Sequence, residues 1–158
     1  SITNMFKSYQ FVIGGVESID KEKYDKLTKN KNVKVVFNQT YNLLANAKAA
    51  IVTSGTASLE AAIFKIPQVV CYKTSFITYS IGKMLVNIKY ISLVNLILND
   101  RIVNELVQGE LNSNNLKNSI NKILKKDNRL EMINAYNNLI NMLYAENPSR
   151  KTAELIVR

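Results

Sequence analysis

The chain has 158 residues with 21 Lys or Arg, 12 Asp or Glu, one Cys and no His, so its formal net charge is +9. This length fits one domain, and 47% hydrophobic with 21% charged residues is typical of a globular chain rather than a disordered one. Without His, these residues alone form no Ser–His–Asp or Cys–His nucleophile system and no His-based metal site. A single Cys excludes an internal disulfide framework and favours a reducing, intracellular compartment.

The first two-thirds of the chain alternates short β-branched runs with helical patterns. We predict strands at 9–13, 33–37, 49–53, 68–72 and 90–93. The stretches between them are long enough for crossover helices. One such helix, from 56 to about 65, would place Leu59, Ala62, Ile63 and Ile66 on one face. The pattern therefore predicts an α/β fold with a Rossmann-like, doubly wound parallel sheet.

The last third of the chain has an all-helical pattern. Two apolar stripes at helical spacing are formed by Leu116, Ile120, Ile123 and Leu124, and by Met132, Tyr136, Leu139 and Leu143. A final helix is expected after Asn147 and Pro148, with an apolar face of Ala153, Ile156 and Val157. We accordingly divide the chain into a Rossmann-like core at 1–112 and C-terminal helices at 113–158.

The positive charge predicts attraction to anions, which include nucleic acid, acidic lipid head groups and phosphorylated small molecules. No dense Lys/Arg block interleaves with aromatic residues, so nucleic acid is not an expected partner. No apolar stretch reaches the ~18 residues that a spanning helix needs, and the first residues lack a signal-peptide pattern. Neither a membrane span nor secretion is expected.

The most informative stretch is 51–72, IVTSGTASLEAAIFKIPQVVCY. Here an apolar strand ends, a Ser-Gly-Thr turn follows and a helix begins. The unsatisfied N–H groups of a helix start attract phosphate. Gly55 allows a ligand to approach the backbone closely, and the hydroxyls of Ser54 and Thr56 can add hydrogen bonds. Ser, Gly and Thr are also ordinary helix-capping residues, so the tripeptide alone leaves both interpretations open.

Glu60 follows Thr56 by four residues and therefore shares its stripe of the helix. Position 57 is Ala, so Glu60 is not part of a capping box. A carboxylate at this place can accept hydrogen bonds from both hydroxyls of a ribose whose phosphates lie at the helix start. The alternative is a solvated Glu that interacts only with the helix dipole.

The segment 72–98 is rich in aromatic and aliphatic residues and is interrupted by Lys73, Lys83 and Lys89. It is either a core-packed helix and strand or a basic apolar surface that approaches a membrane or an acylated ligand. Asn95 lies at an expected strand end, where its amide could reach a ligand. Cys71 is expected to be an inert buried thiol.

Three elements, SGTASLEAAIFKIPQVVCYKTS, YISLVNLI and the later NELVQ, occur in an order that resembles the lipid-A-disaccharide synthase family. The resemblance extends from about Val36 to the C-terminus. It implies the C-terminal, nucleotide-binding half of a two-domain GT-B fold. It also implies an inverting transfer that joins UDP-2,3-diacylglucosamine to 2,3-diacylglucosamine 1-phosphate, without a metal ion or cofactor, at the cytoplasmic face of the Gram-negative inner membrane.

The resemblance also implies site residues. The UDP-sugar contacts would be Ser54, Gly55, Thr56, Glu60, Asn95 and Gln108, with weaker support for Gln39, Thr40, Tyr41 and Tyr72. The acyl chains or the bilayer would lie near Lys73, Phe76, Lys83 and Lys89. Val94 and Asn104 stand where many relatives have Pro.

These residues contain neither the family's LPGSR-like loop, whose arginine serves the donor phosphates, nor its acceptor half with the catalytic base. We therefore expect the donor-binding part of a longer enzyme, with no catalytic residue of its own and no activity alone. The lipid acceptor would bind the other half. The last helix would lack its packing partner, which favours self-association into a homo-oligomer.

Two alternatives stay open. Another GT-B enzyme, such as the UDP-GlcNAc transferase of peptidoglycan synthesis or a UDP-GlcNAc 2-epimerase, could share the Ser-Gly turn and the helical Glu, but it would not explain the YISLVNL element. A non-catalytic basic module that binds membrane or nucleic acid predicts salt-sensitive binding to polyanions and no saturable preference for UDP over AMP.

Overall fold

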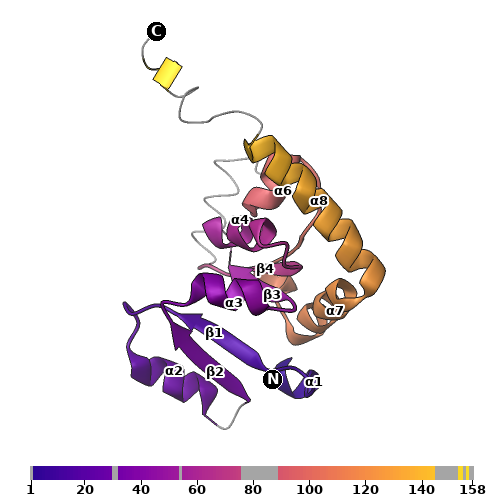
Figure 1. The fold of residues 1–158 in the computed structure, drawn as a ribbon. Helices are drawn as coiled ribbons and strands as arrows, with labels where there is room; N and C mark the ends of the chain where they lie inside the picture. Colours follow the sequence, from indigo (N-terminus) through magenta and orange to yellow (C-terminus); the bar gives the residue numbers. More distant parts are fainter. Residues whose placement is uncertain are drawn as a thin grey trace.

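The computed structural model describes residues 2–29, 32–53, 55–75, 89–144, 153, 154 and 156 (Figure 1). In chain order the elements are α1 (Ile2–Met5), β1 (Phe11–Gly15), α2 (Lys21–Thr28), β2 (Val33–Phe37), α3 (Thr40–Asn46), β3 (Ala50–Thr53), α4 (Thr56–Ile63), β4 (Gln68–Tyr72), α6 (Leu93–Leu98), β5 (Asn104–Val107), η1 (Gln108–Glu110), α7 (Ser113–Leu124) and α8 (Lys126–Tyr144).

All the described strand pairings are parallel, which confirms the predicted Rossmann-like α/β class. The strands form two sheets, β1-β2 and β3-β4-β5. Phe11 lies opposite Val33 in the first sheet, and β4 lies between its two neighbours in the second. The sheet is therefore split between β1 and β3, a feature that the sequence pattern does not predict.

The core lies around β4, whose Val69 and Val70 are fully buried. Because both faces of this strand are covered, its sequence is a continuous apolar run rather than an alternating one. The two predicted apolar stripes of α7 and α8 are confirmed: buried Ile120, Ile123, Met132, Tyr136 and Leu139 belong to the core, and Leu116, Leu124 and Leu143 pack against it. Since α7 and α8 share this core, the division at residue 112 stays a prediction.

Two local predictions are wrong. The segment 90–93 forms no strand: Ser92 is the N-cap of α6, its side chain accepts a hydrogen bond from the Asn95 N–H, and helix begins at Leu93. The strand that follows β4 in the sheet is instead β5, which pairs with β4 from Asn104 onward. On the helix α4, the prediction is wrong only for Ile63, which is 39% exposed, whereas Ala61 is fully buried instead. The other residues of the predicted face are confirmed, because Ala62 and Ile66 are buried and Leu59 packs against the core.

Small side chains explain the orientation of α4. Ser58, Ala61 and Ala62 are completely buried and allow α4 to pack closely against α6 and α8. Gln68 strengthens this packing, because its side-chain amide donates to the Ser58 carbonyl (2.9 Å) and to the Tyr136 hydroxyl (3.1 Å). Burial raises the pKa of Tyr136 and also that of the Cys71 thiol, so both groups stay neutral at physiological pH. The prediction of Cys71 as a buried thiol is confirmed.

The end of the chain is described only in part. Asn147, Pro148 and Val157 lie outside the described residues. Ala153 is exposed, and Ile156 is 78% exposed. Among the helices that the structure describes, none is both long and apolar enough to cross a bilayer.

Candidate functional site

The carboxyl ends of β3, β4 and β5 lie along one edge of their sheet. The register places Thr53 opposite Cys71, and Tyr72 opposite Val107. The residues that follow these strand ends therefore come from three separate parts of the sequence and meet at one edge: Gly55 and Thr56, Lys73 and Thr74, and Gln108. In open parallel sheets, ligands bind beyond this edge.

Gly55 forms the turn between β3 and α4. Its backbone has φ 116° and ψ −156°, which an L side chain rarely adopts, and it is the N-cap residue of α4. The Ser58 N–H (3.2 Å) and hydroxyl (2.8 Å) both donate to the Gly55 carbonyl. Gly55 has no side chain with which to cap the helix, so the start of α4 is suited to receive an anion. Thr56 is exposed there, whereas Ser54 lies outside the described residues.

Glu60 lies one helical turn further along α4 and is half-buried. It lines an open cleft of about 1200 Å³ between β1 on one side and α3, β3 and α4 on the other. A half-buried carboxylate that faces a cleft in this way is suited to accept hydrogen bonds from ligand hydroxyls.

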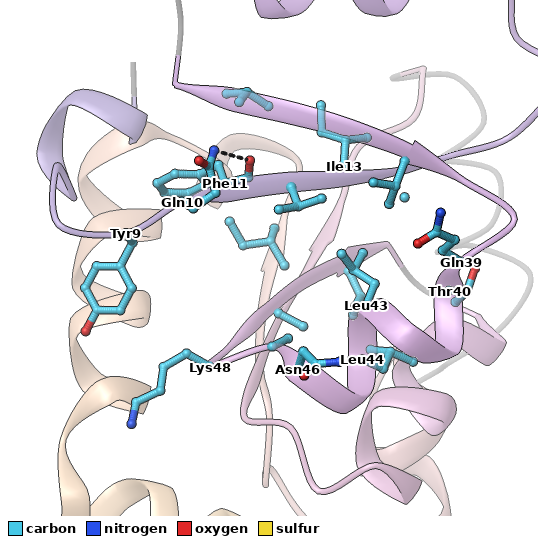
Figure 2. Close-up of a pocket in the computed structure, with 18 of the residues that line it drawn as sticks. Tyr9, Gln10, Phe11, Ile13, Gln39, Thr40, Leu43, Leu44, Asn46 and Lys48 are labelled. Carbon is cyan, nitrogen blue, oxygen red and sulfur yellow. Dashed lines mark hydrogen bonds between the residues drawn. The ribbon is translucent and has the colours of Figure 1, made fainter.

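Gln39 and Thr40 line the same cleft from the start of α3, as Figure 2 shows. The structure thus brings two of the weaker predicted residues to the cleft that contains Glu60. Tyr41 does not line it: its ring is 64% exposed and stacks on Phe64, with 5.6 Å between the ring centroids. The contact of Tyr41 with a ligand stays a prediction.

Asn95 belongs to a buried polar network rather than to an open surface. It lies inside α6, not at a strand end, and is fully buried. Its Nδ2 donates to the Val103 carbonyl and to Glu105 Oε1, and its Oδ1 accepts from the Val103 N–H, each at 2.9 Å. Direct contact with a ligand would require these bonds to break, and this role of Asn95 stays a prediction.

Glu105 is the centre of this network and was not predicted. Its carboxylate accepts from the Ile91 N–H at 3.0 Å and from the Ser92 N–H at 2.9 Å, besides its bond to Asn95. It thereby ties the segment before α6 to β5. The available signal was a single charged residue within the apolar strand pattern of NELV, because a buried charge needs hydrogen-bonding partners.

Gln108 follows β5 and connects the strand ends. Its backbone has a positive φ of 51°, and its Oε1 accepts from the Thr74 N–H at 3.3 Å. Tyr72 is half-buried at the end of β4, and Lys73 is exposed directly after it. The Lys89 ammonium lies 5.0 Å from the Tyr90 ring centroid. Phe76 and Lys83 lie outside the described residues, so a shared acyl-facing surface stays a prediction.

Comparison with known proteins identifies the family. A family model described as lipid-A-disaccharide synthetase matches residues 2–157. The chain belongs to the lipid-A-disaccharide synthase family. This confirms the resemblance seen in the SGTASLE, YISLVNL and NELVQ elements.

Individual members of the lipid-A-disaccharide synthase family show how much of a whole protein this chain covers. The chain is 32% identical over 160 residues to the synthase of Psychromonas ingrahamii, and this match covers 99% of this chain and 42% of that protein. It is 43% identical over 99 residues to the synthase of a Sulfurihydrogenibium species, covering 63% of this chain and 26% of that protein. It is 40% identical over 92 residues to the synthase of Aquifex aeolicus, and this match covers 58% of this chain and 25% of that protein. The chain thus spans less than half the length of these relatives.

Proposed function

We propose that this chain forms the nucleotide-sugar-binding part of an inverting glycosyltransferase of lipid A biosynthesis. The donor would be UDP-2,3-diacylglucosamine and the acceptor 2,3-diacylglucosamine 1-phosphate. The family match over residues 2–157 carries the proposal. The meeting of Gly55, Thr56 and Gln108 at the carboxyl edge of the sheet supports it, because this edge is where open parallel sheets bind nucleotides.

In this proposal the donor diphosphate lies at the start of α4. Gly55 lets the phosphates approach the backbone, and the partial positive charge of the helix start attracts them. As the acceptor hydroxyl attacks the anomeric carbon, negative charge accumulates on the departing UDP, and the same N–H groups stabilise it. The base that removes the hydroxyl proton would come from outside these 158 residues. Glu60 would bind the ribose.

Glu60 provides the test of the donor site. Glu60→Gln in the full-length gene product should weaken UDP binding about 10-fold or more, because charge-assisted hydrogen bonds contribute about 1.5–3 kcal/mol each and 1.4 kcal/mol corresponds to a factor of ten. Calorimetric titration with UDP, and with AMP for comparison, measures this. Glu22→Gln is the matched control, since Glu22 is an exposed carboxylate on α2.

The titration also separates the alternatives. Unchanged UDP affinity in Glu60→Gln would remove Glu60 from the site. Equal, salt-sensitive binding of UDP and AMP would instead favour a non-catalytic anion-binding module. Tighter binding of UDP-GlcNAc than of the diacylated donor would favour one of the other GT-B enzymes.

We also propose that the protein associates peripherally with the cytoplasmic face of the inner membrane through Lys73, Phe76, Lys83 and Lys89. Each Lys near an anionic surface contributes about 1 kcal/mol. Changing the three lysines to Gln should therefore lower binding to phosphatidylglycerol-containing liposomes by roughly 100-fold. The control is the Gln variant of Lys23, Lys26 and Lys29, which removes the same charge from two exposed residues of α2 and from its exposed C-cap residue. Equal losses in both variants would contradict the assigned surface.

A further inference from the structure

A second cleft, the amino-edge cleft, lies at the opposite end of β5 from the candidate donor site. Its volume is about 520 Å³, within the range of about 300–1,000 Å³ that is typical of small-molecule sites. Its walls are the loop 100–102 with the start of β5, the second half of α7 and the first half of α8. Asn104 begins β5 and Gln108 follows its end, so the length of this strand separates the two sites.

A chain of hydrogen bonds orients Arg101 in the amino-edge cleft. Arg101 Nη2 donates to Asn104 Oδ1 at 3.2 Å, and Asn104 Nδ2 donates to the Ser119 hydroxyl at 2.6 Å. Ser119 is buried, and its hydroxyl donates to the Asn115 carbonyl at 2.8 Å. Fixing a long exposed side chain costs conformational entropy, and a ligand that binds the oriented guanidinium avoids that cost. Because a guanidinium has five N–H donors in one plane, Arg101 can keep this bond and still bind a carboxylate through two others.

The charges around the amino-edge cleft favour a ligand with one negative charge and a neighbouring hydrogen-bond donor. Lys122 on α7 adds a second positive charge to that of Arg101, and Asp100 and Glu131 bring two carboxylates. Asp100 Oδ1 accepts from the Arg101 backbone N–H at 2.7 Å, so this carboxylate stabilises its own loop. The two carboxylates would repel a dianionic phosphate more strongly than a single carboxylate. Glu131 can in turn accept a hydrogen bond from an N–H group of the ligand.

The lining of the amino-edge cleft also contains apolar side chains that reach the protein core. Ile123 and Met132 line it and are only 3% and 7% exposed, and both belong to the core cluster. Ile102 and Ala135 line it as well. Small-molecule sites combine such apolar walls with a few polar groups that fix the orientation of the ligand. A fitting ligand therefore carries an apolar group next to its negative charge.

We propose that the amino-edge cleft binds an apolar amino-acid residue with a free α-carboxylate. Arg101 and Lys122 bind the carboxylate, and Glu131 accepts a hydrogen bond from the α-nitrogen. The apolar side chain of the ligand packs on Ile123 and Met132. A free amino acid such as leucine and the C-terminal residue of a peptide both present this chemistry. The cleft is separate from the donor edge, so this inference goes beyond the proposed transferase function and does not rest on it.

Titration of the full-length gene product with N-acetyl-leucine, followed by saturation-transfer NMR, tests the carboxylate site. We expect saturable binding of N-acetyl-leucine and no measurable binding of N-acetyl-leucinamide, which lacks the carboxylate. Arg101→Gln and Lys122→Gln should each weaken binding by about 10-fold or more, because each removes a charge-assisted hydrogen bond. Lys117→Gln is the matched control and should leave binding unchanged, since Lys117 is an exposed lysine of α7 outside the cleft lining.

Two further probes distinguish the sources of the ligand. Tighter binding of leucine than of N-acetyl-leucine would support a free amino acid, whereas tighter binding of N-acetyl-alanyl-leucine would support a peptide C-terminus. Absence of saturable binding of all three probes up to about 10 mM would overturn the proposal. Equal binding of N-acetyl-leucinamide, or equal affinities in Arg101→Gln and Lys117→Gln, would overturn it as well. The probes contain neither uridine nor phosphate, so failure of the donor-site proposal would leave these results interpretable.

Discussion

Replacing Glu105 with Ala is expected to lower the free energy of unfolding by about 3–5 kcal/mol. The side chain is only 8% exposed, and its carboxylate accepts hydrogen bonds from the Ile91 and Ser92 N–H groups and from Asn95 Nδ2. Alanine removes the acceptor of all three donors in a buried place. Urea unfolding, followed by circular dichroism, measures the loss.

The neighbouring substitutions show whether the network is the cause. Glu110→Ala removes an exposed carboxylate five residues away and should change stability by no more than about 0.5 kcal/mol. Glu105→Gln keeps one acceptor oxygen, so its loss of unfolding free energy should lie between those of Glu105→Ala and Glu110→Ala. If Glu105→Ala and Glu110→Ala lost similar amounts, the buried network would contribute little to stability.

This network also shows where sequence analysis was insufficient. The sequence around 90–98 is apolar and β-branched, which favours a strand when only local pattern is considered. Ser92 instead caps a helix, and Glu105 fixes that segment through bonds that span 13 and 14 residues. Side-chain bonds between distant residues leave no periodic pattern, so they are not visible in the sequence.

Strands and helices with strong local patterns were predicted closely. The bounds 33–37 and 68–72 match β2 and β4, because short β-branched runs are flanked by polar or turn residues. The apolar stripes of α7 and α8 were found because their spacing is a local property. The gap between β1 and β3 was not predicted, because the neighbour of each strand in a sheet depends on the whole topology.

The candidate site, like the fold, was predicted in part from the sequence. The Ser-Gly-Thr turn and Glu60 share one short motif, and the structure places Gly55 at the start of α4 with Glu60 facing the cleft. Gln39 and Thr40 reach the same cleft from a different part of the chain. Asn95 was selected as a polar residue in an apolar run, yet its partners Val103 and Glu105 lie within the protein.

Gly55→Ala is expected to weaken UDP binding by roughly 10- to 100-fold and to lower the free energy of unfolding by about 1–3 kcal/mol. A Cβ at this position would meet no atom within 4 Å, so steric overlap is not the cause. The cause is the φ of 116°, at which an L side chain is strained. The turn would relax toward another conformation and move the first N–H groups of α4 away from the phosphates.

Gly109→Ala is the matched control for this substitution. A Cβ at Gly109 would likewise meet nothing within 4 Å, but among the described glycines the positive φ belongs to Gly55. The two substitutions therefore add the same methyl group to equally open space and differ in backbone strain. Calorimetric titration of both variants with UDP should show the loss in Gly55→Ala alone. Equal affinities would mean that the strained turn does not position the donor phosphates, and the anion site would then have to lie elsewhere along the carboxyl edge.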